Sequence, residues 1–376
     1  MDIGKFEASG ITQEMVVEAT AYPCGGFIVS ILNNQMFVAP IGWEMNSGWE
    51  ERLARKDNHH ALAFILKAMC HYTLPDMTFV LNTFDKLCRE DLEHPSPVLS
   101  WGKDVWESDH QIMFPYWTNF DMAHKLAALK LPGPDWSNRM EGAVWRGTST
   151  GGISIVANFD EFSRFKLVTQ CMNSSVCDAK FSTLVQMNPE TQNLVTALGA
   201  MGGTIPMHEW LSYKYIIVND GNLAPSSRIT AFMHSGSAML WQESHTLEFF
   251  YEKLEPYVHY IPVSYNFGDL LHKIRWAQSH DAQAKKIADN AKAFAEEHFT
   301  KATFECYLAR VLRRYAAAQR FAPGLFYDGF KANTSMASAG SKGFTRARPE
   351  DPGAWASTST EWKFIGPVAE AAPCPA

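Results

Sequence analysis

The chain has 376 residues, of which 46% are hydrophobic, 13% aromatic and 19% charged, and its 33 basic and 40 acidic side chains give a net charge of −7. This length and apolar content can fill the cores of two domains of roughly 150 residues each, and they exclude disorder over most of the chain. The acidic balance disfavours nucleic acid as the main partner. No stretch reaches the ~18 apolar residues of a transmembrane segment, and the first residues lack the pattern of a secretory signal.

Short apolar runs alternate with helical patterns along much of the chain. The predicted strands, each followed by polar residues or glycine, are 78–82, 143–145, 215–219 and 238–241. A short helix is expected to begin near Ser226 or Ser227 and to end at Gly236, which completes a strand–helix–strand unit. This alternation is typical of an α/β fold with largely parallel sheets.

The C-terminal part of the chain changes character twice. Apolar residues recur at helical spacing over 269–321, for example at Leu270 and Ile274, so helices are expected to close the ordered region. From Pro323 onward Ala, Ser, Thr, Gly and Pro dominate. Such a segment buries too little apolar area to offset its ordering entropy, so 323–376 is predicted to be a flexible tail.

The first strand end with polar chemistry follows 78–82. Open parallel sheets bind ligands just past the carboxyl ends of their strands, so these positions are the places to look for chemistry. Asp85 comes three residues after the strand, and its carboxylate could act as a general base in a cleft. The alternative interpretation is a surface loop or a helix cap.

The second strand end begins at Arg146. Gly147 and Gly152 have the spacing of a phosphate-binding loop, but Ile153 stands where the triphosphate-cleaving type needs lysine. What remains is an arginine followed by Thr148 and a hydroxyl-rich loop whose backbone amides could meet a phosphate. A plain connection of Gly, Ser and Thr is the alternative.

The third strand end runs from Asp220 to Arg228. Ser226 and Ser227 stand at the expected start of a helix beside Arg228, and amides, hydroxyls and a guanidinium together make an anion site. Ordinary capping of the helix by serine, with a solvated arginine, is the alternative.

Several other chemistries lack their motifs. His208 and Glu209 have no second histidine at metalloprotease spacing, and neither a G-x-S-x-G elbow nor a G-x-G-x-x-G dinucleotide loop is present. The seven cysteines include no CxxC pair, which disfavours structural zinc. We favour reduced cysteines in the core, with one or two disulfides as the alternative. Two Asn-x-Ser patterns occur, at Asn173–Ser175 and Asn333–Ser335.

Several short motifs follow one another in a fixed order along the chain. Leu74–Asp85 reads Leu-Pro-Asp-x-x-x-Val-x-Asn-x-x-Asp, and Trp145–Thr148 reads Trp-Arg-Gly-Thr. The other segments that take part are Met113–Thr118, Arg164–Val168, Tyr213–Tyr215, Ser226–Arg228, Leu247–Tyr251 and Tyr257–Val263. In this order, from about Gly10 to Tyr315, the chain resembles the CAP10-type glycosyltransferases, family 90, which include protein O-glucosyltransferases and fungal capsule-associated xylosyltransferase-like proteins.

The resemblance implies a GT-B architecture, in which two Rossmann-like halves face a cleft. It assigns 1–135 to an acceptor half, 136–300 to a UDP-sugar half, 301–322 to a closing helix and 323–376 to the tail. It implies inverting transfer from UDP-glucose or UDP-xylose without a metal ion, to a hydroxyl of a protein, glycan or lipid. By the same resemblance the compartment is the lumen of the secretory pathway.

The resemblance also implies roles for single residues. Asp85 falls on the catalytic base, and the donor diphosphate is expected to contact Arg146, Gly147, Thr148, Arg164, Ser226, Ser227 and Arg228. Ser149 stands where animal members carry an arginine, which gives Arg164 and Arg228 more of the diphosphate contact. The alternative is a non-catalytic nucleotide-sugar or glycan-binding module of the same fold. An epimerase is disfavoured, because the chain has no dinucleotide-binding loop.

Overall fold

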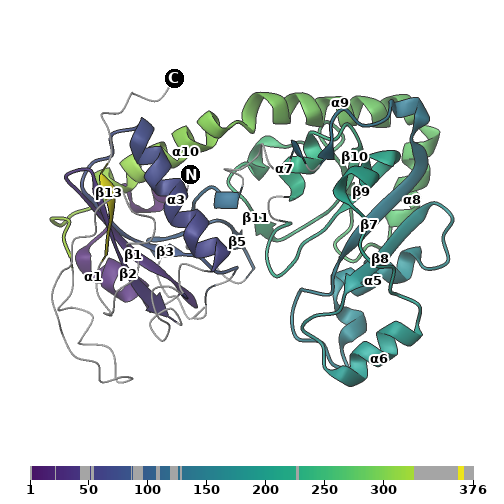
Figure 1. The fold of residues 1–376 in the computed structure, drawn as a ribbon, viewed down its shortest axis with the longest axis horizontal. Helices are drawn as coiled ribbons and strands as arrows, with labels where there is room; N and C mark the ends of the chain where they lie inside the picture. The colour runs from purple at the N-terminus through teal and green to yellow at the C-terminus, as the bar shows by residue number, and fades with distance from the viewer. Residues whose placement is uncertain are drawn as a thin grey trace. The chain divides into compact units, whose positions relative to one another are not determined.

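The computed structural model describes residues 2–21, 23–42, 51, 55–85, 87, 96–106, 111–118, 126–127, 129–225, 228–325 and 363–367. The chain divides into two compact units, one made of residues 1–120 and 302–376 and the other of residues 121–301 (Figure 1). Among the described helices, none combines the length and the apolar composition that crossing a bilayer requires.

The first unit contains a six-stranded mixed sheet in the order β13-β2-β1-β3-β4-β6. β1 pairs antiparallel with β2 and with β3, whereas β3–β4 and β4–β6 are parallel. Asn33 and Asn34, with φ of 50° and 58°, close the β1–β2 hairpin as a two-residue turn of this kind requires. The strands of this sheet are β1 (Gly25–Leu32), β2 (Gln35–Gly42), β3 (Met77–Asn82), β4 (Val98–Ser100), β6 (Ile112–Met113) and β13 (Lys363–Pro367). The short strand β5 (Lys103–Asp104) lies outside it.

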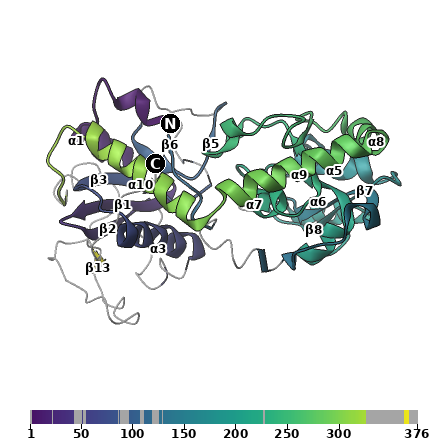
Figure 2. The ribbon, with the colours of Figure 1, turned by 90° about the horizontal axis from the view of Figure 1, so that it is seen from above.

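Helices lie on both sides of this sheet, and Figure 2 shows α3 and α10 on opposite sides. Phe79 of β3 meets Tyr315 of α10 edge to face, with ring centroids 6.0 Å apart. All six residues of β3 are buried, as expected for a strand covered on both faces. The helices of the unit are η1 (Asp2–Phe6), α1 (Gln13–Ala19), α3 (Lys56–His71) and α10 (Lys301–Ala318).

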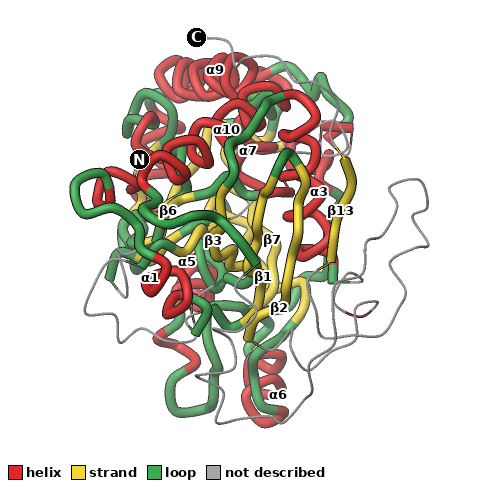
Figure 3. Tube along the Cα trace, turned by 90° about the vertical axis from the view of Figure 1, so that its left-hand side faces the viewer, coloured by secondary structure: helices red, strands yellow, loops and turns green. Residues whose placement is uncertain are grey.

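Part of the predicted tail belongs to this sheet. β13 pairs antiparallel with β2 and forms the edge strand, as Figure 3 shows. The Gly324 carbonyl accepts hydrogen bonds from the hydroxyls of Ser30 and Thr78, at 2.9 and 3.1 Å. Composition alone misses these contacts because the free edge of β2 can pair with an extended segment of almost any sequence. Residues 326–362 lie outside the described residues.

The second unit contains a five-stranded sheet in the order β12-β10-β9-β7-β8, and every neighbouring pair is parallel. β9 and β10 consist almost wholly of buried residues, because strands of a parallel sheet are covered on both faces. The strands of this sheet are β7 (Met140–Thr148), β8 (Cys177–Thr183), β9 (Tyr213–Val218), β10 (Ala238–Gln242) and β12 (Ile261–Val263). The short strand β11 (Thr246–Leu247) lies outside it.

Helices pack against this sheet. α5 contacts β8, α8 contacts β7, β10 and β12, and α9 contacts β10 and α7. They are η4 (Trp136–Asn138), η5 (Phe159–Glu161), α5 (Ser163–Cys171), α6 (Pro189–Ala197), η6 (Met207–Ser212), α7 (Arg228–Met233), η7 (Tyr251–Lys253), α8 (Leu270–Ser279) and α9 (Asp281–His298). The predicted α/β class with largely parallel sheets is confirmed. That the two halves face each other across a cleft stays a prediction.

Candidate functional site

Three strand ends of the second unit meet at one edge of its sheet. β7, β9 and β10 are parallel, so their last residues, Thr148, Val218 and Gln242, lie at the same edge. The loop after β9 is tied to β10, because the Asp220 amide donates to Gln242 Oε1 at 3.2 Å. Just past β10, the Ser244 hydroxyl donates to the Asp220 carboxylate. This edge is where open parallel sheets bind their ligands.

Arg164 of α5 joins two of these strand ends. Its Nε donates to the Asp220 carbonyl at 2.7 Å, and its Nη1 donates to the Thr148 carbonyl at 2.9 Å and to Thr148 Oγ1 at 3.3 Å. The residue is only 3% exposed. Burial lowers the pKa of its guanidinium to about 9, the charge of Arg228 also lowers it, and Asp220 acts in the opposite direction. Arg164 is therefore a buried cation that remains charged at neutral pH.

Asp220 is a buried carboxyl group at the same edge. Burial raises its pKa from 3.8 to about 6, although hydrogen bonds from Ser244 and Thr246 and the charges of His245 and Arg164 lower it. Its Oδ1 atom is buried without a hydrogen-bond partner among the residues that the structure describes. A carboxyl group with a perturbed pKa beside a buried cation is typical of a functional site.

Arg228 is the first residue of α7 and is partly buried. Its positive charge lies close enough to Arg164 to lower the pKa of that guanidinium. The structure therefore brings together Thr148, Arg164 and Arg228 from the predicted donor residues. Ser226 and Ser227 lie outside the described residues, so their roles stay predictions.

Arg146 and Gly147 have other neighbours. Arg146 donates to the carbonyls of Trp145 and Asp178, at 2.8 and 3.0 Å, and pairs with the Asp178 carboxylate at 2.9 Å. A Cβ atom on Gly147 would lie 2.5 Å from the ring of Trp145, so the missing side chain leaves room for that indole. Both residues contact the sheet itself, and their predicted contact with a diphosphate stays a prediction.

Asp85 lies in a turn that follows β3 in the first unit. Asn82 fixes this turn, because its Nδ2 donates to the Phe84 carbonyl at 2.9 Å and its Oδ1 accepts the Phe84 amide at 3.2 Å. Asn82 Nδ2 also donates to Ser100 Oγ at 3.1 Å, which ties the turn to the end of β4. Asp85 itself is exposed. The backbone of Phe84 is thus held in place, and Asp85 follows it at an exposed position.

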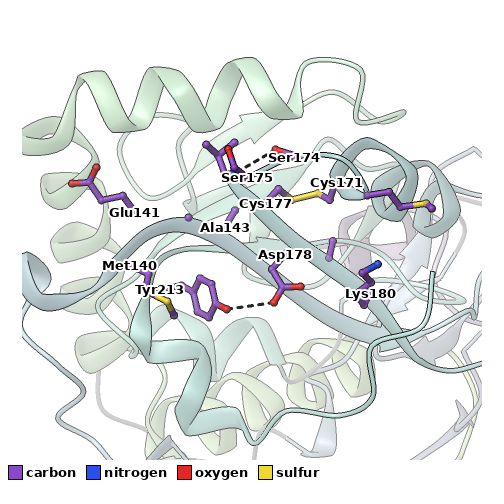
Figure 4. A pocket seen from close by; sticks show the side chains of 14 residues that line it. Met140, Glu141, Ala143, Cys171, Ser174, Ser175, Cys177, Asp178, Lys180 and Tyr213 are labelled. Atoms are coloured by element: carbon purple, nitrogen blue, oxygen red, sulfur yellow. Dashed lines mark hydrogen bonds between the residues drawn. A yellow bond between two sulfur atoms is a disulfide. The ribbon is translucent and has the colours of Figure 1, made fainter. Parts of the chain in front are cut away.

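A pocket of about 560 Å³ lies at the opposite, amino edge of the second unit's sheet (Figure 4). It is lined by the first residues of β7, β8 and β9, among them Glu141, Asp178 and Tyr213. Tyr213 donates its hydroxyl to the Asp178 carboxylate at 3.3 Å, and burial and that carboxylate raise the tyrosine's pKa. The pattern of strand ends could not reveal this pocket, because it directs attention to the other edge.

A disulfide joins Cys171 to Cys177 at this pocket. The favoured interpretation of reduced cysteines is wrong for this pair, because the turn between α5 and β8 brings their Cα atoms within 5.2 Å. Cys24 is also disulfide-bonded. In the described part of the chain, no three His, Cys, Asp or Glu side chains gather as metal ligands would. The expectation of metal-independent chemistry remains a prediction.

Sequence similarity links this chain to a known family. The sequence model of a family described as Glycosyl transferase family 90 matches residues 1–346. The chain is 30% identical to Protein O-glucosyltransferase 3 of Mus musculus over 69% of this chain and 50% of that protein. It is 28% identical to Protein O-glucosyltransferase 2 of Danio rerio, over 68% and 50%, and 25% identical to the O-glucosyltransferase rumi homolog of Anopheles gambiae, over 85% and 77%.

The structural likeness is weaker. Anabaena Alr3699/HepE, crystallised in complex with UDP-glucose, is similar with a TM-score of only 0.34 and 15% identity over 58% of this chain and 57% of that one. The chain spans about half the length of the mouse and zebrafish relatives that it matches. With its match across nearly the whole sequence, the chain belongs to glycosyl transferase family 90.

Proposed function

We propose that this chain is a glycosyltransferase that moves glucose or xylose from a UDP-sugar to an acceptor hydroxyl. The observation that carries the proposal is the pair of arginines at the carboxyl edge of the all-parallel sheet. Arg164 is buried there, and Arg228 is close enough to lower its pKa. Two like charges repel each other, and a diphosphate bound to them would relieve that repulsion and form charge-assisted hydrogen bonds. The leaving group of a UDP-sugar is such an anion.

In this proposal Asp85 is the catalytic base. Its carboxylate takes the proton of the acceptor hydroxyl while that oxygen forms a bond to the anomeric carbon of the donor. The bond from this carbon to the diphosphate breaks on the opposite face, so the configuration inverts and UDP leaves with the electron pair. The exposure of Asp85 supports this role, as do the Asn82 hydrogen bonds that fix its turn.

The charge that develops on UDP is stabilised in this proposal by the protein's own donors. Arg164 and Arg228 supply the positive charge, and Thr148 adds a hydroxyl that Arg164 already contacts. Ser226 and Ser227 precede Arg228 and complete the proposed set with Gly147. Arg146 would join it only after its ion pair with Asp178 rearranges. Full turnover in excess EDTA is the expected sign that no metal ion takes part.

The acceptor and the compartment follow from the relatives and from the cysteines. The names of the relatives, protein O-glucosyltransferases, support a protein acceptor over a glycan or a lipid. The Cys171–Cys177 disulfide supports the lumen of the secretory pathway, because disulfides persist in oxidising compartments. We assign the acceptor to the half that carries Asp85 and the UDP-sugar to the half that carries Arg164.

The test is UDP release against a panel of UDP-sugars, with folded extracellular protein domains as acceptors. Asp85→Asn should lower kcat by about 100-fold or more, as loss of a general base does, and should leave the affinity for UDP unchanged. Asp160→Asn removes an exposed carboxylate of the other unit and is the matched control. Equal turnover by Asp85→Asn and the wild type would exclude Asp85 as the base. UDP binding without transfer or hydrolysis would favour the non-catalytic module.

A further inference from the structure

The turn between α5 and β8 is a small closed loop. Cys171 is the last residue of α5 and Cys177 the first of β8, and their disulfide encloses residues 172–176. Three of the enclosed residues, Asn173, Ser174 and Ser175, form the Asn-x-Ser pattern that accepts N-linked sugars when the middle residue is not proline. The proposed glycosyltransfer uses none of these residues.

The loop holds this pattern at the surface. The Ser174 amide donates to the Cys171 carbonyl at 3.1 Å, and Ser174 Oγ accepts the Val176 amide at 3.3 Å. Asn173 and Ser175 are both exposed, whereas Cys171 and Cys177 are buried. The backbone is therefore anchored at both ends by the buried cysteines, and Asn173 is exposed between them.

We propose that Asn173 is a site of N-glycosylation. The Asn173 amide nitrogen forms a bond to the anomeric carbon of the first sugar of a lipid-linked diphosphate oligosaccharide. The bond between that carbon and the diphosphate oxygen breaks, the amide loses one proton, and the lipid diphosphate leaves with the electron pair. The host's oligosaccharide transferase performs this step in the lumen of the secretory pathway.

The surroundings of the loop suit a carbohydrate. Ser174 and Ser175 line the pocket at the amino edge of the sheet, whose other lining includes Glu141, Asp178 and Lys180 (Figure 4). A glycan on Asn173 thus begins beside a pocket whose lining includes these charged side chains together with apolar ones such as Met140. The loop precedes β8, so the glycan lies at the edge of the sheet opposite to Arg164 and Arg228.

Two independent observations point to the same compartment. The disulfide needs an oxidising environment, and the Asn-x-Ser pattern is used in the eukaryotic compartment that provides one. The loop itself contains both features within seven residues, from Cys171 to Cys177. Neither observation depends on which sugar the enzyme transfers or on whether it is catalytic.

The experiment sends the full chain through the lumen of a eukaryotic host behind a cleavable secretion signal. Asn333→Gln is included in every version, so that Asn173–Ser175 is the remaining Asn-x-Ser pattern. Amidase treatment in heavy-oxygen water followed by peptide mass spectrometry marks each glycosylated asparagine. We expect the label at Asn173 and the loss of one glycan from the intact mass after treatment, in secreted and in retained protein alike.

Adjacent serines provide the matched controls. Ser175→Ala removes the hydroxyl that the pattern requires and should abolish the modification, as should Asn173→Gln. Ser174→Ala changes the neighbouring residue but keeps the pattern, so it should remain glycosylated, and Ser175→Thr should as well. An unmodified Asn173 peptide, in cells that glycosylate a co-expressed control protein, would overturn the proposal. A label that persists in Ser175→Ala would do the same.

Discussion

Replacing Asp220 with asparagine isolates the effect of one buried carboxyl group. The two side chains have the same shape, and the asparagine oxygen can still accept the hydrogen bond that Ser244 donates to Asp220. No direct ion pair is broken, because Arg164 donates to the backbone carbonyl of Asp220 rather than to its carboxylate. The substitution therefore removes a titration and leaves the packing intact.

The magnitude follows from the pKa of Asp220. Burial raises it from 3.8 to about 6, so the folded protein binds this proton more tightly than the unfolded chain does. The contribution of Asp220 to the free energy of unfolding therefore falls as the pH rises from 3.8 to about 6, and it is lost completely above that range. A pKa difference of about 2 corresponds to about 3 kcal/mol in the free energy of unfolding. The asparagine side chain does not titrate, so Asp220→Asn should gain this amount relative to the wild type at about pH 7.5 and almost nothing at about pH 3.5.

Urea unfolding of both proteins between about pH 3.5 and pH 8 measures this difference. The gap in the free energy of unfolding should open with the pH, while Asp160→Asn, which changes an exposed aspartate, should show no such trend. A gap that does not vary with pH would refute the assignment of a raised pKa to Asp220. A wild type more stable than Asp220→Asn at neutral pH would mean that the charge of Arg164 stabilises the carboxylate more than burial destabilises it, and would also refute the raised pKa.

Three further substitutions test other parts of the site. Arg228→Ala should weaken UDP binding by about 1.5–3 kcal/mol, the value of a charged hydrogen bond, and unchanged affinity in calorimetry would remove Arg228 from the donor site. Gly147→Ala sets a Cβ atom 2.5 Å from the Trp145 ring and should cost about 1–3 kcal/mol in urea unfolding, whereas Gly4→Ala, with open space around it, should be neutral. Asn82→Ala frees the turn that carries Asp85 and should lower kcat without changing UDP affinity; an equal loss of both would contradict a positioning role.

Much of the fold can be predicted because buried strands read as continuous apolar runs. The runs 78–82 and 215–219 became β3 and β9, with ends shifted by no more than two residues. The β1–β2 hairpin is not predicted because β1 is buried along almost its whole length and shows no alternation, although Asn33–Asn34 is a usable turn signal. β13 depends on pairing with a strand more than 300 residues earlier, which local sequence does not encode.

The candidate site is harder to predict than the fold. Residue types at a strand end point to Arg228, and the family resemblance points to Arg164, but neither reveals which partner each guanidinium contacts. Arg164 bonds to two backbone carbonyls, and a carbonyl is present at every residue, so no side-chain pattern marks it. The disulfide at Cys171 depends on a turn geometry that six residues of separation permit but do not require.

The Trp145–Gly147 signature illustrates why a motif and a ligand contact can differ. Trp145 donates its indole N–H to Asn219 Oδ1 at 2.8 Å and so links β7 to the end of β9. Arg146 reaches Asp178 on the neighbouring strand β8, and Gly147 leaves space for the Trp145 ring. All three residues thus fasten the strands whose ends carry Thr148 and Asp220. Arg164 can bridge these two strand ends only while they stay in register. Substitutions in Trp145–Gly147 should therefore weaken donor binding by shifting the strands, even where the altered side chain never touches the donor.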